Sequence, residues 1–228
     1  MIVDVVIPAL DEEKAIGQVV QSIPKNLVRH IVVADNGSKD KTAEVAMRNG
    51  ALVVQAKQRG YGSACLAGIA QLKSFALLAD IVVFLDGDFS DHPEQMPQVI
   101  APILENKADL VIGSRALGKR ERGAMLPQQR FGNWLATFLI RILYGHRYTD
   151  LGPFRAIRMP ALEQIQMQDV NYGWTVEMQI KALKHKLNVV EVPVDYRKRE
   201  GQSKIAGTLK GTLLAGYKII LTIIKYAK

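Results

Sequence analysis

Short hydrophobic runs alternate with amphipathic segments through the first half of this 228-residue chain. The runs are rich in Val and Ile, as in buried strands, and the segments between them have the apolar spacing of helices. We predict strands at Ile2–Ile7, Ile31–Ala34, Leu52–Gln55, Ile81–Leu85 and Leu110–Gly113, and helices at Glu12–Ser22, Lys41–Asn49, Ser63–Leu78 and Glu94–Leu104. The alternation predicts an α/β fold in which helices flank both faces of a mostly parallel sheet.

The regular alternation ends near Arg115, and the second half is less periodic. Its pattern predicts a basic loop at Gly118–Arg130, an apolar helix at Phe131–Tyr144 and a strand at Val189–Val194. Thr208–Lys228 predicts a C-terminal amphipathic helix that either lies on a membrane surface or packs on the domain or another subunit. No repeat or linker divides the chain, so we predict one domain over residues 1–228.

Composition and charge narrow the classes of partner. The chain carries 30 Lys and Arg against 22 Asp and Glu, a net charge of +8, which favours anionic partners such as phosphates, nucleotides or acidic lipid. Its single cysteine, Cys65, forms no internal disulfide and no metal-ligand pair. With no long uninterrupted apolar run, we expect a cytoplasmic protein, with peripheral contact to the inner face of a membrane as an additional hypothesis.

Two carboxylates follow the fourth predicted strand directly. Asp86 and Asp88 are spaced i, i+2, which places both on one side of an extended chain. Like charges so placed repel unless a cation lies between them, and Mg²⁺ or Mn²⁺ binds carboxylate and phosphate oxygens together. The pair therefore predicts a metal site for a diphosphate-bearing substrate, with an ordinary solvated turn as the alternative.

Two further polar segments have both functional and structural interpretations. Asp35–Ser38 follows the second predicted strand, so it is expected at the same sheet edge as the carboxylate pair, although turns use the same residue types. Gly60–Ala64, preceded by Lys57 and Arg59, indicates either a backbone cradle for a phosphate or a tight turn.

Seven segments occur in an order found in one enzyme family. They are Pro8–Glu13, Asp35–Thr42, Asp86–Asp88, Gly113–Arg115, Asp150–Arg155, Glu191–Val194 and Gly201–Lys204. Together they resemble glycosyltransferase family 2, with the greatest similarity to the polyprenyl-phosphate branch typified by dolichyl-phosphate mannose synthases. The resemblance implies a GT-A fold, with a Rossmann-like sheet. It also implies a nucleotide-sugar-binding half at residues 1–115, an acceptor half at 116–206 and the amphipathic helix at 207–228.

The resemblance also implies an activity. It is the inverting transfer of a hexose from a nucleotide sugar, such as GDP-mannose or a UDP-sugar, to a polyprenyl phosphate at the membrane surface. Transfer to a soluble hydroxyl acceptor and a sugar-phosphate nucleotidyltransferase are the alternatives. Nucleic acid is not an expected partner, because paired carboxylates on a cleft rim have no use in binding it. A homo-oligomer is an additional hypothesis.

Site residues follow from the resemblance by matching position. The donor-binding residues would be Pro8, Leu10, Glu12, Asp35, Asp86 and Asp88. Lys57 is added to them because it precedes the candidate phosphate cradle at Gly60–Ala64. Asp86 and Asp88 would also hold the Mg²⁺ or Mn²⁺, and Asp88 is counted among the catalytic residues.

The remaining catalytic candidates are anion-binding and proton-accepting residues. Arg115, Arg130 and Arg199 would contact anions near the transferring sugar or the acceptor phosphate, with Arg197 as the alternative to Arg199. A hydroxyl acceptor needs a general base, for which Asp150 and Glu177 are the candidates. Either carboxylate is equally compatible with a structural role, as a partner of Arg155 or as a charge on a helix face.

Overall fold

The computed structural model describes residues 1–201 and 209–227, without the side chains of residues 209–213 and 215. The motif positions 202–204, and Thr208 and Lys228 at the two ends of the predicted C-terminal helix, lie outside the described residues.

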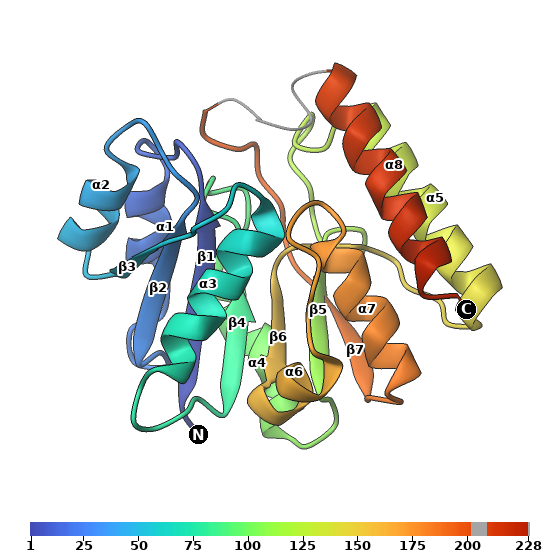
Figure 1. The fold of residues 1–228 in the computed structure, drawn as a ribbon, viewed down its shortest axis with the longest axis horizontal. Coiled ribbons are helices and arrows are strands. Elements are labelled where there is room, and N and C mark those ends of the chain that lie inside the picture. Colours follow the sequence, from blue (N-terminus) through green and yellow to red (C-terminus); the bar gives the residue numbers. More distant parts are fainter. Residues whose placement is uncertain (202–208, 228) are drawn as a thin grey trace.

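A seven-stranded sheet forms the centre of the molecule (Figure 1). Its strands are β1 (Val3–Ala9), β2 (His30–Asp35), β3 (Leu52–Gln55), β4 (Ile81–Phe84), β5 (Leu110–Ser114), β6 (Arg155–Arg158) and β7 (Val189–Pro193). They lie in the order β3-β2-β1-β4-β6-β5-β7, and only β6 runs antiparallel to its neighbours β4 and β5. The predicted α/β fold with a mostly parallel sheet is confirmed.

Helices cover both faces of this sheet. Buried residues of α1 (Ile16–Ser22), α2 (Thr42–Arg48) and α4 (Met96–Leu104) belong to one hydrophobic cluster. Those of α3 (Tyr61–Lys73), α5 (Pro127–Tyr144), α6 (Met159–Ile165), α7 (Trp174–Lys184) and α8 (Leu209–Lys225) belong to the other. A 3₁₀ turn, η1 (Pro93–Gln95), precedes α4.

The central strands explain why the sheet needs helices on both sides. Val5 and Ile7 of β1 pack in one cluster, whereas Val6 between them packs in the other. Side chains of successive strand residues point to opposite faces, so a strand buried on both faces is a continuous hydrophobic run. Such a strand ends where polar residues begin, and this places the polar segments at one edge of the sheet.

Three elements were not predicted: β6, α6 and α7. β6 has no hydrophobic run, because its sequence begins and ends with arginine. Arg155 is fully buried and donates to the backbone carbonyls of Gly152 and Thr175, at 3.1 and 2.9 Å. Backbone carbonyl oxygens thus accept the hydrogen bonds of this buried guanidinium. The sequence alone would suggest an exposed segment, because arginine is usually found at the surface.

The C-terminal helix α8 packs beside α5 and α7 at one end of the molecule (Figure 1). Thr222 and Ile223 are buried, and the Tyr144 hydroxyl at the end of α5 donates to the Ile223 carbonyl at 2.7 Å. The helix therefore buries one side against the domain. In the parts of the chain that the structure describes, no helix is long and apolar enough to cross a membrane.

Candidate active site

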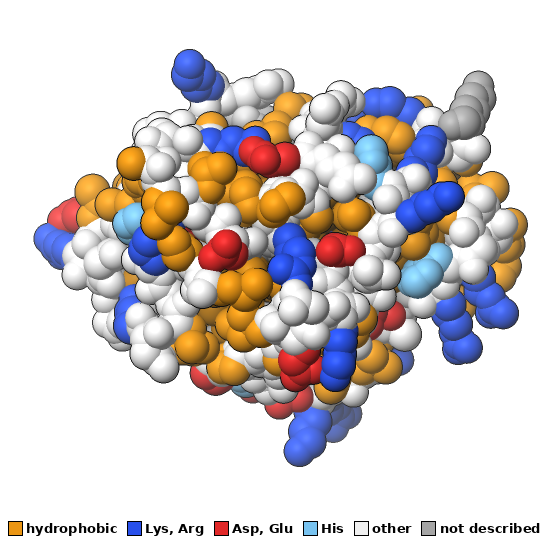
Figure 2. All heavy atoms as spheres, turned by 90° about the horizontal axis from the view of Figure 1, so that it is seen from below, with side chains coloured by type: hydrophobic (Ala, Val, Ile, Leu, Met, Phe, Trp, Pro, Cys, Tyr) orange, Lys and Arg blue, Asp and Glu red, His pale blue; other side chains and the backbone are white. Residues whose placement is uncertain are grey.

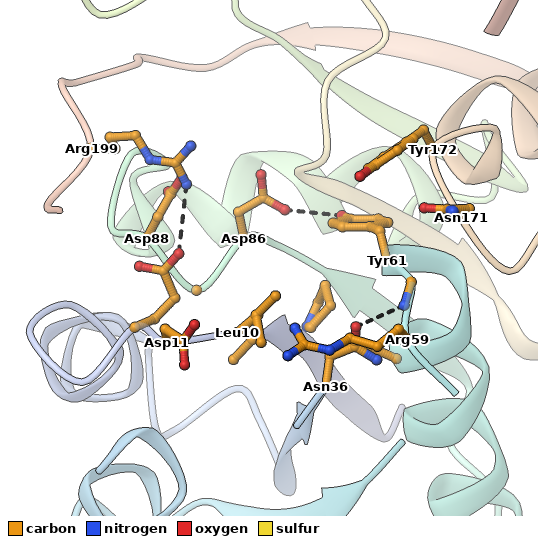
Figure 3. Close-up of a pocket in the computed structure, with 16 residues that line it drawn as sticks. Leu10, Asp11, Asn36, Arg59, Tyr61, Asp86, Asp88, Asn171, Tyr172 and Arg199 are labelled. Atoms are coloured by element: carbon orange, nitrogen blue, oxygen red, sulfur yellow. Dashed lines mark hydrogen bonds and ion pairs between the residues drawn. The ribbon is translucent and has the colours of Figure 1, made fainter. Parts of the chain in front are cut away.

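A pocket of about 550 Å³ opens at the carboxyl ends of β1 and β4 (Figure 3). The segment Pro8–Glu12 lines one wall, and Asp86–Asp88, which follows β4, lines another. Arg199 reaches in beside Asp88, and the loop residues Asn171 and Tyr172 close the opposite side. The hydrophobic strands β1 and β4 are neighbours in the sheet, so their polar ends meet here.

The two carboxylates at this pocket have different partners. The Tyr61 hydroxyl donates to Asp86 at 3.0 Å, and the Ser90 amide donates to Asp88 at 2.9 Å. Burial and the charge of Asp88 raise the pKa of Asp86 to about 6, although Tyr61 and Arg199 act in the opposite direction. The two carboxylates therefore repel each other when both are ionised, and a bound cation would relieve this repulsion.

A third carboxylate, Asp91, supports the turn and was not predicted. It is buried, and it accepts a hydrogen bond from the Asp86 amide at 3.2 Å. Burial, together with the charges of Asp86 and Asp88, raises the pKa of Asp91 well above its usual range. Asp91 thus holds the backbone that carries Asp86.

The residues present fit a hard divalent cation. Both oxygens of a carboxylate are hard ligands, and Asp86 and Asp88 face the pocket. Within the described residues, no group of three or more His, Cys, Asp or Glu side chains forms a closed metal cage. An ion held by only two carboxylates takes its other ligands from water and from substrate oxygens, as Mg²⁺ commonly does.

Arg199 is the cation that the structure brings to these carboxylates. Its guanidinium forms an ion pair with Asp88 and lies 3.7 Å from Glu12. Arg197, the alternative, points elsewhere: it packs over the Phe89 ring at 3.8 Å and donates to the Asp91 carbonyl at 3.0 Å. Of the two arginines, the structure places Arg199 at the pocket.

Asn171 and Tyr172 line the pocket and were not singled out in the sequence, whereas Arg59 and Tyr61 belong to a segment that was. Arg59 and Tyr61 flank Gly60, in the segment interpreted as either a phosphate cradle or a tight turn. The structure favours the turn, because the Ser63 amide at the start of α3 already donates to Val170 O at 2.9 Å. A Cβ on Gly60 would lie 2.0 Å from that same oxygen, so glycine permits the close approach.

Two predicted donor residues lie outside the pocket lining. Asp35 is buried and accepts hydrogen bonds from the Ser38 amide at 3.0 Å and from the Gln55 side chain at 2.8 Å. It therefore stabilises the turn, while its neighbour Asn36 lines the pocket. Lys57 is exposed.

A second pocket, of about 350 Å³, lies beside α5. Its lining includes Arg130 and Asp150 from the predicted set. It also includes three arginines and three aromatic side chains that were not predicted as site residues: Arg120, Arg141, Arg147, Trp134, Phe138 and Tyr148. Four guanidinium groups thus converge on a pocket with aromatic walls.

Arg115 and Asp150 form a two-pronged ion pair between the pockets. The Nε and Nη2 atoms of Arg115 each donate to a different oxygen of Asp150, both at 2.8 Å. Burial opposes the charge of Arg115, but Asp150 outweighs it and raises the pKa of the guanidinium well above its usual range. Asp150 lines the second pocket, while the charge of Arg115 also acts on Asp86 in the first.

Glu177 lies away from both pockets. It is fully buried on α7 and accepts from the backbone amides of Gln168 and Asp169, at 3.0 and 2.7 Å. Lys181 and the Tyr226 hydroxyl complete its surroundings, at 2.7 and 2.8 Å. Glu177 therefore connects Tyr226, the residue that follows α8, to the loop that carries Asn171 and Tyr172.

Known proteins resemble this chain over nearly its whole length. A dolichyl-phosphate hexose transferase of Haloferax volcanii is 32% identical over 203 residues, covering 88% of this chain and 85% of that protein. An undecaprenyl-phosphate mannosyltransferase of Micrococcus luteus is 27% identical over 221 residues, covering 90% and 88% respectively.

A solved structure agrees with these relatives. Glucosyl-3-phosphoglycerate synthase from Mycobacterium tuberculosis, in complex with Mn²⁺, UDP-glucose and phosphoglyceric acid, superposes with a TM-score of 0.80 at 25% identity. The match covers 99% of this chain and 79% of that one, which confirms the GT-A type of fold. Residues 4–166 match the family described as Glycosyl transferase family 2. The chain therefore belongs to glycosyl transferase family 2 and is a glycosyltransferase.

Proposed function

We propose that this enzyme transfers a hexose, with inversion, from a nucleotide sugar to a polyprenyl phosphate at a membrane surface. The observation that carries this proposal is the pair of unlike pockets. The first is lined by carboxylates and the second by four arginines and three aromatic rings, and the Arg115–Asp150 pair lies between them.

The first pocket suits a nucleoside diphosphate sugar. Pro8 and Leu10 offer apolar contacts for a nucleoside, and the Tyr61 and Tyr172 rings add flat surfaces. Glucosyl-3-phosphoglycerate synthase, which has the same fold, binds UDP-glucose. The volume of about 550 Å³ lies within the range typical of ligand pockets.

Asp86 and Asp88 would hold Mg²⁺ or Mn²⁺ against the donor diphosphate. When bound, such an ion would stabilise the negative charge that develops on the leaving diphosphate. Arg199 stands next to Asp88 and adds a fixed positive charge at the same place. The solved structure with Mn²⁺ supports a divalent cation in this family without choosing between the two metals.

The second pocket suits an acceptor that joins a phosphate to an apolar chain. Arg130, Arg141 and Arg147 provide guanidinium groups of the kind that bind phosphate oxygens in pairs. Trp134 and Phe138 provide the apolar wall against which an isoprenoid chain would lie. The names of the two relatives, which act on dolichyl and undecaprenyl phosphate, support this chemistry.

A phosphate acceptor needs no general base, and both candidate bases, Asp150 and Glu177, are engaged in other interactions. A phosphate is largely anionic at neutral pH, so it attacks without prior loss of a proton to the enzyme. Asp150 is engaged by Arg115 through both oxygens, and Glu177 is engaged by backbone amides and Lys181. In the proposal Asp150 positions Arg115, and Glu177 holds the fold of the loop.

A soluble phosphorylated acceptor is the second candidate. It is favoured by the similarity to glucosyl-3-phosphoglycerate synthase, whose structure holds phosphoglyceric acid. The arginines of the second pocket would bind such an acid as well, but the aromatic wall would then have no apolar group to contact.

Kinetics of Arg141→Ala and Arg147→Ala test the acceptor pocket. Loss of one charge-assisted contact should raise the KM for a short-chain polyprenyl phosphate about tenfold or more, with the donor KM unchanged. Lys14→Ala, on the exposed loop before α1, is a matched charge control. An unchanged acceptor KM in both arginine variants would place the acceptor elsewhere.

A further inference from the structure

The outer face of α5 carries a stripe of large apolar side chains. Phe131, Trp134, Phe138 and Ile142 recur at spacings of three and four, which places them on one side of the helix. Their exposed fractions lie between 44% and 62%. The three rings are in contact, with centroids 5.8 and 5.5 Å apart. They form an ordered aromatic surface that the domain leaves uncovered.

The neighbouring helix α8 carries a similar stripe. Leu214, Tyr217, Leu221 and Ile224 are between 42% and 63% exposed, on the side opposite the buried Ile223. We call the two stripes together the α5–α8 face. With Leu143, these helices hold nine of the seventeen large exposed hydrophobic side chains among the described residues. An apolar surface of this kind is typical of an interaction site.

The two segments of the chain that carry this face contain basic side chains and no acidic ones. The sequence has no Asp or Glu from Arg122 to Thr149, and none from Gly201 to Lys228. Arg130 and Arg141 flank the aromatic stripe on α5, while Lys225 lies near the end of α8 and Lys218 of α8 forms an ion pair with Asp169 at 3.2 Å. Figure 2 shows hydrophobic and basic side chains together at the right-hand end of the molecule. Apolar side chains bordered by cations complement an anionic lipid surface.

The α5–α8 face is continuous with the acceptor pocket. Trp134 and Phe138 belong to the stripe and also line the second pocket. A ligand with its chain in the lipid would therefore meet the arginines of the pocket without leaving the apolar surface.

We propose that the α5–α8 face lies on an anionic lipid bilayer, with Phe131, Trp134 and Ile142 inserted among the lipids. The inference rests on the proposed function, because a polyprenyl phosphate is itself held in a membrane. It moves the main membrane contact from the C-terminal helix, where the sequence suggested it, to the aromatic stripe of α5. α8 buries Thr222 and Ile223 against the domain, and its exposed side forms the border of the surface.

Vesicle binding without any acceptor tests the surface directly. Vesicles of phosphatidylglycerol and phosphatidylcholine should bind the full chain, and phosphatidylcholine alone should bind it more weakly. The Phe131→Ser/Ile142→Ser variant should lower the partition coefficient about tenfold or more, because two large apolar side chains are lost from the interface. Leu77→Ser/Leu78→Ser, exposed in the loop before β4, is the matched control and should bind as the unchanged protein does.

Fluorescence identifies the inserted side chain. The chain has two tryptophans, and Trp174 is buried. Brominated lipids should therefore quench Trp134 in the unchanged protein and leave the emission of Trp134→Phe nearly unaffected. Quenching that is equal in both proteins would overturn the placement of Trp134.

The outcomes separate this inference from the proposed function. Binding to vesicles together with failure to transfer sugar to a short-chain prenyl phosphate would contradict the function and support the surface. Sugar transfer to the short-chain prenyl phosphate by a protein that never binds vesicles would support the function and contradict the surface. Equal binding by the two double variants, or a dimer that Phe131→Ser/Ile142→Ser dissociates, would overturn the proposal, the latter by assigning the face to a second copy of the chain.

Discussion

Arg115 and Asp150 form a two-pronged ion pair with both hydrogen bonds at 2.8 Å. The Asp150 carboxylate also accepts from the Arg115 backbone amide at 2.8 Å. This arrangement fixes a positive charge between the two pockets. It also engages both oxygens of Asp150.

Asp150→Asn tests that positioning role. The substitution removes the partner of a mostly buried arginine, so we expect a loss of about 3 kcal/mol in the free energy of unfolding. Turnover should fall at every pH, since Arg115 would no longer be held in place. Urea denaturation and a pH–rate profile measure the two effects. A variant that keeps its stability and loses the acidic limb of the profile would instead identify Asp150 as a base.

Asp88→Asn tests the metal site. The carboxylate lies after a strand and not in the hydrophobic core, so the variant should unfold cooperatively near the normal temperature. Sugar transfer should drop by about a hundredfold or more, because charge stabilisation of the leaving group is lost. Chelation of divalent metals should reproduce the loss in the unchanged enzyme. Full activity in excess chelator would rule out the metal.

The pH dependence of metal binding follows from Asp86. Its pKa is raised from 3.8 to about 6 in the folded protein. Below pH 6 the carboxyl group is largely protonated and has no negative charge with which to bind a cation, so Mn²⁺ affinity should rise as the pH increases from 5 to 7. Removing the Asp88 charge should lower the pKa of Asp86 itself, since that charge is one cause of the raised pKa. Titration calorimetry with Mn²⁺ at several pH values checks the first statement, and an NMR titration of the Asp86 carboxyl in metal-free Asp88→Asn checks the second.

The raised pKa of Asp86 also makes the stability of the metal-free protein depend on pH, and this dependence runs opposite to that of metal affinity. A carboxyl whose folded pKa is raised favours folding most when it is protonated, so this contribution is present below pH 3.8 and is lost as the pH rises through 6. Metal-free Asp86→Asn should therefore gain stability relative to the unchanged protein at pH 7, and gain less at pH 5. Thermal unfolding at the two pH values provides the measurement.

Glu177→Gln distinguishes a structural carboxylate from a base. The buried side chain accepts from two backbone amides and pairs with Lys181, so the substitution should cost about 1–3 kcal/mol of stability. Turnover at a temperature well below unfolding should be nearly normal. A stable variant without activity would reverse the assignment.

Much of the fold could be predicted because strands β1 to β5 are continuous hydrophobic runs that end in polar turns. β6 escaped prediction since buried Arg155 obtains its partners from backbone carbonyls, a feature without a local sequence signal. The carboxylate pair Asp86 and Asp88 was recognisable from its spacing after a strand. Asn171 and Tyr172 were not, because they reach the pocket only through the packing of their loop on Gly60 and Gly62.

The central claim is tested most directly by the product of the reaction. The purified enzyme, Mn²⁺, a panel of UDP- and GDP-sugars and a short-chain polyprenyl phosphate would be incubated together, with product identity and anomeric configuration read by mass spectrometry and NMR. We predict a glycosyl polyprenyl phosphate of inverted configuration and release of a nucleoside diphosphate that depends on the acceptor. Transfer to phosphoglyceric acid but not to the prenyl phosphate, or release of pyrophosphate, would contradict the account.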